Sequence, residues 1–345
     1  MIKKENYCVA VVGVTGAVGR QMVRMLEERD FPISSFKPLA SGRSAGQTIR
    51  FKGKEWTVEE ATPESFEGVD IALFSAGGDV SRQLVPEAVA RGAVCIDNTS
   101  AFRMDPQTPL VVPEVNADKI ADHRGVIANP NCSTIQMVVA LKPLYDAYGI
   151  SRVIVSTYQS VSGAGARAIE ELRRQSAAVL AGEPVTAEVL PVASLPVKHP
   201  IAFNVIPQID KFWDNGFTNE EMKMVNETKK ILGDDSIRVT ATCVRVPVFY
   251  GHSESVYVEL DRDFELEDVR KLLSAAPGVV VVDDPANQRY PLATEAAGRK
   301  ETFVGRLRRD LFHPRALNMW IVSDNLLKGA AWNAVQIAEY LIGRR

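Results

Sequence analysis

Short apolar runs alternate with helix-like patterns over the first third of the chain, and this rhythm constrains the fold more than any other feature. The apolar runs cover 8–14, 36–41, 70–76 and 93–97, and amphipathic segments ending at Glu28 and Arg91 separate them. Parallel strands need a crossover between them, usually a helix. The order therefore predicts βαβ units and an α/β fold with a Rossmann-like, doubly wound, mostly parallel sheet.

Beyond residue 150 the apolar runs become longer and the helical patterns fewer. Runs at 153–160, 237–248, 255–260, 302–307 and 318–323 predict a second, α+β domain with a largely antiparallel sheet. A helical pattern follows residues 129–131 and contains Pro143, where we expect a kink. The last amphipathic segment, 325–342, can return to the first domain, and the proline-rich stretch 183–200 is expected on the surface.

Composition excludes several classes of partner. The formal net charge is -3 and no basic run occurs, so we expect no nucleic acid partner. No stretch reaches the ~20 apolar residues of a membrane span, and the first residues do not resemble a secretory signal, so we expect a cytoplasmic protein without a membrane. The 4 cysteines are widely spaced and form no CxxC pair, which indicates free thiols and no metal site.

A glycine-rich turn follows the first predicted strand and opens the first predicted helix. In a βαβ unit this position binds the pyrophosphate of a dinucleotide through backbone N–H groups. The spacing GxxGxxG differs from the commoner GxGxxG, so an ordinary tight turn is the alternative. The predicted cofactor contacts here are Gly13, Thr15, Gly16, Ala17, Val18 and Gly19.

The second predicted strand ends in Ser41-Gly42-Arg43-Ser44, without the acidic residue that NAD-specific sites place there. A guanidinium between hydroxyls suits a 2′-phosphate, because its fork matches phosphate oxygens and the charges attract. Ser41, Arg43 and Ser44 therefore favour NADP over NAD. A solvated surface arginine is the alternative.

Cys132 differs from the other three cysteines, which lie in apolar strand patterns typical of buried thiols. It follows Asn129-Pro130-Asn131 and opens a predicted helix, whose first N–H groups and dipole stabilise a thiolate. A thiolate is a strong nucleophile, although a cysteine at a helix start can also be structural.

The segment Asn129 to Thr134 resembles the nucleophile motif of bacterial aspartate-semialdehyde dehydrogenases. Other segments are similar in the same order, and so many ordered matches are far more selective than one motif. They are Gly13 to Gly19, Ser41 to Gly46, Asn98 to Arg103, Gln159 to Gly165, Glu220 to Lys223, Arg245 to Pro247 with His252, and Ser323 to Gly329.

The resemblance implies partners for each group of the family's substrate, aspartyl phosphate. Arg245 would clamp the carboxylate, Arg103 and Lys223 would hold the phosphate, and Glu220 would receive the ammonium. From spacing alone, Arg245 could be an exposed strand residue. The i,i+3 pair of Glu220 and Lys223 is, by itself, more typical of a solvent-facing salt bridge.

The resemblance also implies roles around the thiol. Gln159 would orient the acyl group, and His252 would take the thiol proton and later protonate the hemithioacetal oxygen. The sequence alone does not choose His252 among the 4 histidines. By resemblance, Ser162 and Gly163 contact the nicotinamide half of NADP, while Asn131 and Asn325 position the thiol and the carboxamide.

Together these features predict the domains, the assembly and the reaction of the protein. Residues 1–131 plus 326–345 form an NADP-binding domain, and 132–325 form a catalytic and dimerisation domain of a homodimer or homotetramer. The reaction is NADPH-dependent reduction of aspartyl phosphate to aspartate semialdehyde through a Cys132 thioester, in lysine, threonine and methionine (diaminopimelate) biosynthesis. One alternative is N-acetyl-gamma-glutamyl-phosphate reductase, whose motif reads Asn-Pro-Gly-Cys. Another is a non-catalytic NADPH-binding redox sensor that uses the Cys132 thiol.

Overall fold

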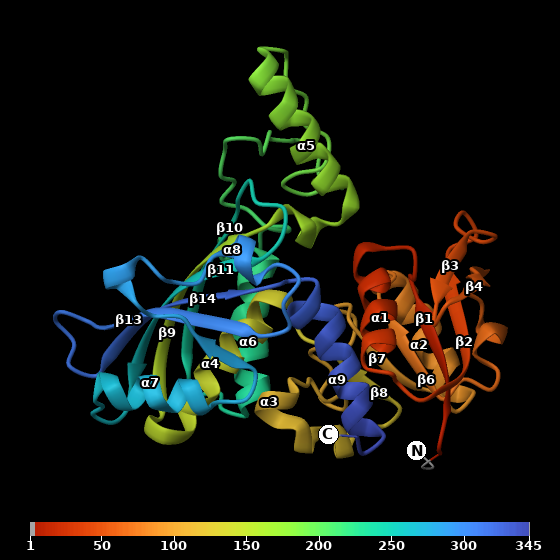
Figure 1. Ribbon diagram of the computed structural model, residues 1–345, viewed down its shortest axis with the longest axis horizontal. Coiled ribbons are helices and arrows are strands. Elements are labelled where there is room, and N and C mark those ends of the chain that lie inside the picture. The colour runs from red at the N-terminus through yellow and green to blue at the C-terminus, as the bar shows by residue number, and fades with distance from the viewer. Residues whose placement is uncertain (1–3, 345) are drawn as a thin grey trace. The chain divides into compact units, whose positions relative to one another are not determined.

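The chain divides into two compact units in a computed structural model that describes residues 4–344 (Figure 1). The first unit comprises Met1–Asn131 and Ala330–Arg345, and the second comprises Cys132–Gly329. The chain therefore returns to the first unit at Ala330, slightly later than the boundary expected at residue 326. None of the described helices is long and apolar enough to cross a membrane.

The first unit contains a six-stranded sheet in which every pair of neighbours is parallel. The strand order is β5-β2-β1-β6-β7-β8, so the order reverses at β1, and the predicted doubly wound sheet is confirmed. The strands are β1 (Tyr7–Val12), β2 (Ile33–Ala40), β5 (Glu59–Glu60), β6 (Ile71–Phe74), β7 (Val94–Asp97) and β8 (Val126–Ala128). A separate hairpin of β3 (Thr48–Phe51) and β4 (Lys54–Thr57) was not expected.

Helices complete the first unit by burying apolar faces. They are α1 (Ala17–Glu28), α2 (Gly78–Ala90), α3 (Pro113–Asn116) and α9 (Trp332–Leu341), with short 3-10 helices at Pro63–Phe66 and Ala117–Asp122. β6 and β7 are buried along their whole length, as is usual for central parallel strands. The predicted C-terminal helix begins with a π-helical turn at Leu327–Ala331 before α9, which packs on α1 and β7.

The second unit contains a mixed, largely antiparallel sheet, as predicted. β9 (Ile150–Gln159), β11 (His252–Leu260), β14 (Ala316–Ser323) and β13 (Thr302–Arg309) pair antiparallel in that order. The two outer strands, β10 (Arg238–Arg245) and β12 (Val279–Val281), pair parallel with β9 and β13.

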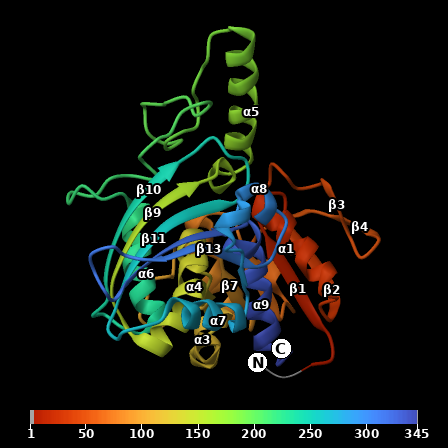
Figure 2. The same cartoon turned by 60° about the vertical axis from the view of Figure 1, so that its left-hand side comes forward.

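Helices of the second unit pack against its sheet or extend from it. They are α4 (Cys132–Tyr148), α5 (Ala166–Ala181), α6 (Asn219–Leu232), α7 (Leu266–Ala275) and α8 (Ala293–Ala296), with 3-10 helices at Val161–Ala164 and Pro285–Asn287. α4 packs on α6, β9 and β11, and it continues through Pro143. α5 extends away from the sheet in both views, and most of the following stretch at 183–200 has no regular structure (Figures 1 and 2).

A chain of buried amides fixes the loop that precedes Cys132 within the first unit. The Asn129 side chain donates to the Asn98 Oδ1 at 2.7 Å and to the Ala330 main-chain oxygen at 3.2 Å. Asn333 donates to the Asn129 Oδ1 at 2.7 Å and to the Val111 main-chain oxygen at 3.0 Å. Asn129 and Asn333 are both fully buried. The α9 helix therefore holds the loop through hydrogen bonds that water does not replace.

We expect Asn333→Ala to cost about 1–3 kcal/mol of unfolding free energy, because it leaves buried acceptors without donors. The midpoint of thermal unfolding, measured by calorimetry, should fall by a few degrees. Arg82→Ala is the matched control, since its ion pair with Asp79 is largely exposed and contributes little. Equal midpoints for the two variants would show that the amide chain does not stabilise the fold.

Candidate active site

A cavity of about 640 Å³ lies at the carboxyl end of β1, beside the glycine-rich turn. Gly13 has φ +83, and a Cβ there would lie 2.6 Å from the Ser75 carbonyl oxygen, so the turn needs glycine. No side chain caps α1 at Gly16, which leaves the first N–H groups of the helix available to an anion. Gly13, Thr15 and Gly16 line this cavity, while Ala17, Val18 and Gly19 form the first turn of α1. The observed cradle fits a dinucleotide pyrophosphate.

The other wall of this cavity contains Ser41 and Arg43, at the end of β2. Ser44 lies in the same turn, since its N–H donates to the Ser41 main-chain oxygen at 2.8 Å, and the Thr15 hydroxyl lies 3.4 Å from the Ser44 hydroxyl. The turn therefore presents hydroxyls and a guanidinium together.

Glu60 is a cavity residue that the sequence analysis missed. β5 pairs with β2 so that Glu60 lies opposite Ala40, and the Glu60 Oε1 would be 2.8 Å from a Cβ on Gly42. The strand end thus has an acidic neighbour after all, supplied by strand pairing rather than by the β2 sequence. The short run Glu59-Glu60 has no strand pattern of its own that could have revealed this.

Cys132 is the first residue of α4, as the sequence predicted. A Cβ on Gly329 would lie 2.8 Å from the Cys132 Cβ, so the chain passes directly against the thiol-bearing residue. Cys132 is half-buried, whereas Cys95 and Cys243 are buried and burial raises the pKa of both thiols. Burial also raises the pKa of the Cys8 thiol. The other three thiols are therefore held in the unreactive protonated form.

The ends of three adjacent strands bring Arg245, Gln159 and His252 into one row. β10 pairs with β9 so that Arg245 lies opposite Gln159, and the Gln159 Nε2 lies 3.5 Å from the His252 Nε2 across the β9–β11 pair. All three side chains are almost completely buried. Side chains two residues apart on a strand share a face, and Gln159 shares its face of β9 with the buried Val155 and Thr157, so the row lies on the buried face of the sheet.

Arg245 is a charged side chain that is buried away from water. Its Nη1 donates to the Ser160 main-chain oxygen at 2.7 Å, and its Nε has no hydrogen-bond partner among the described residues. Burial lowers the pKa of the guanidinium, while negative charge at Glu220 and Cys132 raises it. The alternative of an exposed strand arginine is therefore wrong, and the unused N–H suits an anionic ligand group.

His252 is held in one tautomer by the strand beside it. The Ser160 N–H donates to the His252 Nδ1 at 3.1 Å, so the neutral ring carries its proton on Nε2. Burial, followed by the positive charge of Arg245, lowers the His252 pKa to about 3. The ring is therefore neutral at physiological pH, with an N–H facing Gln159. Ser160 lies in the Gln159 to Gly165 segment, but nothing in the sequence indicated that its N–H fixes this tautomer.

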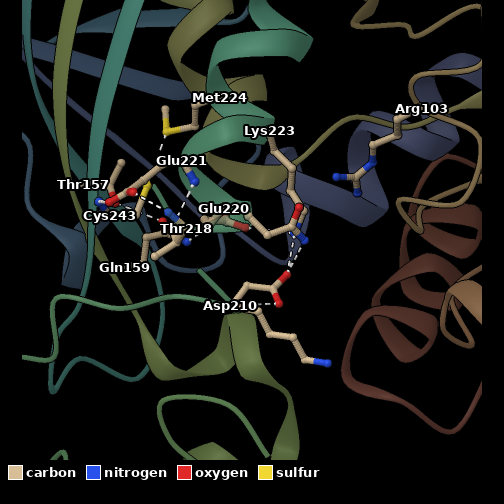
Figure 3. A network of polar contacts seen from close by, with 12 residues as sticks. Arg103, Thr157, Gln159, Asp210, Thr218, Glu220, Glu221, Lys223, Met224 and Cys243 are labelled. Carbon is tan, nitrogen blue, oxygen red and sulfur yellow. Dashed lines mark hydrogen bonds and ion pairs between the residues drawn. The ribbon is translucent and has the colours of Figure 1, made fainter. Parts of the chain in front are cut away.

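A second polar cluster joins this row from α6 (Figure 3). The Gln159 Nε2 donates to the Glu220 Oε1 at 3.2 Å, and Lys223 pairs with Glu220 at 3.2 Å and with Asp210 at 3.3 Å. Glu220 is buried, so this helical pair is not the solvent-facing salt bridge that its spacing alone suggested. Asp210 was missed, because it comes from a loop with no pattern of its own.

The loop after β9 is organised around Asn325. Its Oδ1 accepts from the Ser160 hydroxyl at 3.0 Å and from the Gly251 N–H at 3.0 Å, and its Nδ2 donates to the Ser162 hydroxyl at 3.0 Å. A Cβ on Gly163 would lie 2.9 Å from the Arg245 Nη1 and 3.2 Å from the His252 Cε1. This loop thus packs directly on the row.

Two predicted site residues belong to the first unit. Arg103 is buried, and its guanidinium donates to the main-chain oxygens of Asn129 at 2.9 Å and Asn98 at 2.8 Å. Asn131 is also buried, next in sequence to Cys132. No cluster of metal-ligating side chains occurs among the residues that the structure describes.

Comparisons with known proteins agree with this geometry. The family model for the NAD binding domain of semialdehyde dehydrogenases matches residues 8–123, and the model for their dimerisation domain matches residues 141–328. Aspartate-semialdehyde dehydrogenase from Bacillus subtilis (strain 168) is 60% identical over 334 residues, which cover 96% of each chain.

Solved structures match over the same extent. Aspartate semialdehyde dehydrogenase II from Vibrio cholerae, complexed with ASA, is 50% identical with a TM-score of 0.94, covering 98% of this chain and 99% of that one. The Candida albicans enzyme with NADP is 25% identical with a TM-score of 0.74, covering 97% and 98%. The predicted resemblance is thus confirmed, and the chain belongs to the aspartate-semialdehyde dehydrogenase family.

Proposed function

We propose that this chain is a phosphorylating aldehyde dehydrogenase that reduces L-aspartyl 4-phosphate to L-aspartate 4-semialdehyde with NADPH. The pathway supplied is lysine, threonine and methionine (diaminopimelate) biosynthesis. The observation that carries this proposal is the buried Arg245 guanidinium, whose Nε donates to none of the described residues and whose charge is attracted by negative charge at Cys132. A carboxylate is the natural partner for such a group, because leaving a buried charge unpaired is costly.

The described residues also include partners for the substrate's ammonium group, phosphate and acyl oxygen. Glu220 is a buried carboxylate suited to an ammonium group, which an N-acetylated substrate lacks. This favours aspartyl phosphate over the substrate of N-acetyl-gamma-glutamyl-phosphate reductase. Lys223 and Arg103 supply positive charge for the phosphate as it leaves. Gln159 has its amide oriented by Glu220 and Thr157, so it can hold the acyl oxygen.

Cys132 attacks the acyl carbon, the bond to the phosphate oxygen breaks, and a thioester remains on the sulfur. A bound nicotinamide cofactor supplies the hydride that reduces the acyl group. The Cys132 sulfur then leaves as a thiolate when the carbonyl re-forms. His252, neutral with its proton on Nε2, is in the form that donates a hydrogen bond to the negative charge that develops on the oxygen of the reacting carbonyl.

NADP is the cofactor that the cavity in the first unit favours, because Arg43 and the hydroxyls of Ser41 and Ser44 suit a 2′-phosphate. Glu60 opposes this preference by placing negative charge nearby. Ser162, Gly163 and Asn325 would meet the nicotinamide half, and Asn131 would help position the thiol. We further propose a cytoplasmic homodimer or homotetramer assembled through the second unit.

The reaction is tested by phosphate-dependent reduction of NADP with aspartate semialdehyde, followed by acid quenching and peptide mass spectrometry. We expect an acylated peptide that contains Cys132, and we expect Cys132→Ala to abolish both turnover and the acyl adduct. Cys8→Ala is the matched control and should keep both. Full dehydrogenase turnover in Cys132→Ala would contradict the thioester route, whereas absence of turnover in the unmodified chain would favour the redox sensor.

Arg245→Lys tests recognition of the carboxylate. Lysine keeps the charge but loses the planar fork, so kcat/KM for aspartate semialdehyde should fall by about 10–100-fold, the equivalent of one charge-assisted hydrogen bond. An aldehyde that lacks the carboxylate serves as the control substrate, and its kcat/KM should change little. Equal losses on both aldehydes would contradict a clamp on the carboxylate.

Arg43→Glu and Glu60→Gln test the cofactor assignment in opposite directions. Arg43→Glu should raise the KM for NADP far more than the KM for NAD, because it replaces attraction to the 2′-phosphate with repulsion. Glu60→Gln should lower the KM for NADP, since it removes a negative charge from the same cavity. Steady-state kinetics with both cofactors measures this, and equal effects of Arg43→Glu on NADP and NAD would refute a 2′-phosphate site.

A further inference from the structure

A second row of buried side chains lies beneath the row formed by Arg245, Gln159 and His252. Each member of this second row lies two residues from a member of the first row on the same strand. Cys243 in β10 lies opposite Thr157 in β9, and Thr157 lies opposite Glu254 in β11. Because strand side chains alternate, this second row points to the same face of the sheet. Thr157 serves the first row directly, since its hydroxyl donates to the Gln159 Oε1 at 2.9 Å.

Glu254 is a carboxyl group with none of its surface exposed. Neither of its oxygens has a hydrogen-bond partner among the described residues. Burial raises its pKa well above the ordinary value, and the neighbouring Gln136 side chain opposes this only in part. A buried carboxylate without a cation is far more costly than a buried carboxylic acid.

No cation among the residues that the structure describes pairs with Glu254. Cys243 and His252 are the titratable residues nearest on the strands, and both are neutral at physiological pH. From α6, the acidic Glu220 and Glu221 act on Cys243, and the cation of that helix, Lys223, pairs with Glu220. The Arg245 guanidinium is directed to the Ser160 main-chain oxygen, and β14 presents the apolar Ile321 opposite Glu254.

Gln136 supplies the missing connection to the reacting thiol. It lies one helical turn after Cys132 in α4, and its Nε2 donates to the main-chain oxygen of His252 at 3.3 Å. Its Oε1, like the Glu254 oxygens, is buried and accepts no hydrogen bond from any described residue. The Gln136 Oε1 and an ionised Glu254 carboxylate are both acceptors and would repel each other. Once Glu254 carries a proton, its hydroxyl can donate a hydrogen bond to the Gln136 Oε1.

We propose that Glu254 is a positioning residue that works as a neutral carboxylic acid, donating its proton to the Gln136 Oε1. Gln136, fixed in this way, ties the Cys132 end of α4 to the main chain at His252. Glu254 touches neither substrate nor cofactor, so it acts on the reaction through Gln136. This inference rests on the proposed function only for its effect on turnover, because the protonation state can be measured without any substrate.

Three variants separate the neutral acid from other roles. Glu254→Gln keeps the shape and offers an amide N–H to Gln136, so kcat should stay within about twofold of the unmodified chain. Glu254→Leu removes the donor and should lower kcat about tenfold, the equivalent of one hydrogen bond, with little change in KM. Gln136→Leu should lower kcat similarly, and Glu254→Leu added to it should cost little more, because both changes break one link.

Stability against pH is the readout that a merely space-filling role would not change. In the unfolded chain Glu254 ionises near pH 4.3, whereas in the folded chain it keeps its proton. The unmodified chain therefore loses stability as pH rises above that value, and Glu254→Gln does not incur this loss. The unfolding midpoint of Glu254→Gln minus that of the unmodified chain should increase from about pH 5 to about pH 8.

Infrared difference spectroscopy at neutral pH gives a direct test. The unmodified chain should show the carbonyl stretch of a protonated carboxylic acid, and Glu254→Gln should lack it. Absence of that band, or a Glu254→Gln midpoint that falls relative to the unmodified chain as pH rises, would overturn the inference. Unmodified kcat in Glu254→Leu would also overturn it. Loss of turnover in every variant and in the unmodified chain, with the infrared band present, would instead reject the proposed function.

Discussion

The antiparallel pairing of β9 with β11 is the contact on which the site depends. It places the Ser160 N–H against the His252 Nδ1, and it brings Gln159 beside the same ring. The parallel pairing of β10 with β9 then adds Arg245. A slip of one residue in either register would turn these side chains to the opposite face of the sheet. Register, rather than any single side chain, therefore assembles the polar row.

Burial gives this row its chemical character. It holds His252 neutral, and it keeps Arg245 away from water with an unused N–H. The same physical effect acts on the thiols, since it keeps Cys95 and Cys243 protonated while Cys132 remains half-buried at the start of α4. Low polarity strengthens each electrostatic interaction inside the site and also makes every unpaired group costly. A substrate with matching charges is stabilised in such surroundings, and a mismatched one is not.

Residues without a reacting group contribute as much to the geometry of the site as the reacting side chains do. Gly329 and Gly163 leave room where a side chain would collide with Cys132 or with Arg245 and His252. Asn129 and Asn333 hold the loop before the thiol through buried amide hydrogen bonds. Asn325 gathers the hydroxyls and N–H groups of the loop after β9. All of these residues except Asn333 lie within the segments that carry the family resemblance, so the resemblance extends well beyond the catalytic groups.

The sequence by itself determined the two sheets, the helix that starts at Cys132 and the glycine turn, because apolar periodicity and local backbone chemistry act over neighbouring residues. It did not reveal Glu60, Asp210, Gln136 or Glu254, and it left Arg245 and the Glu220–Lys223 pair open between surface and site. Only the tertiary structure decided these, since burial and hydrogen-bond partners depend on strand register and helix packing between residues far apart in the chain. A side chain's chemistry is encoded locally, but the dielectric surroundings that decide its charge are not.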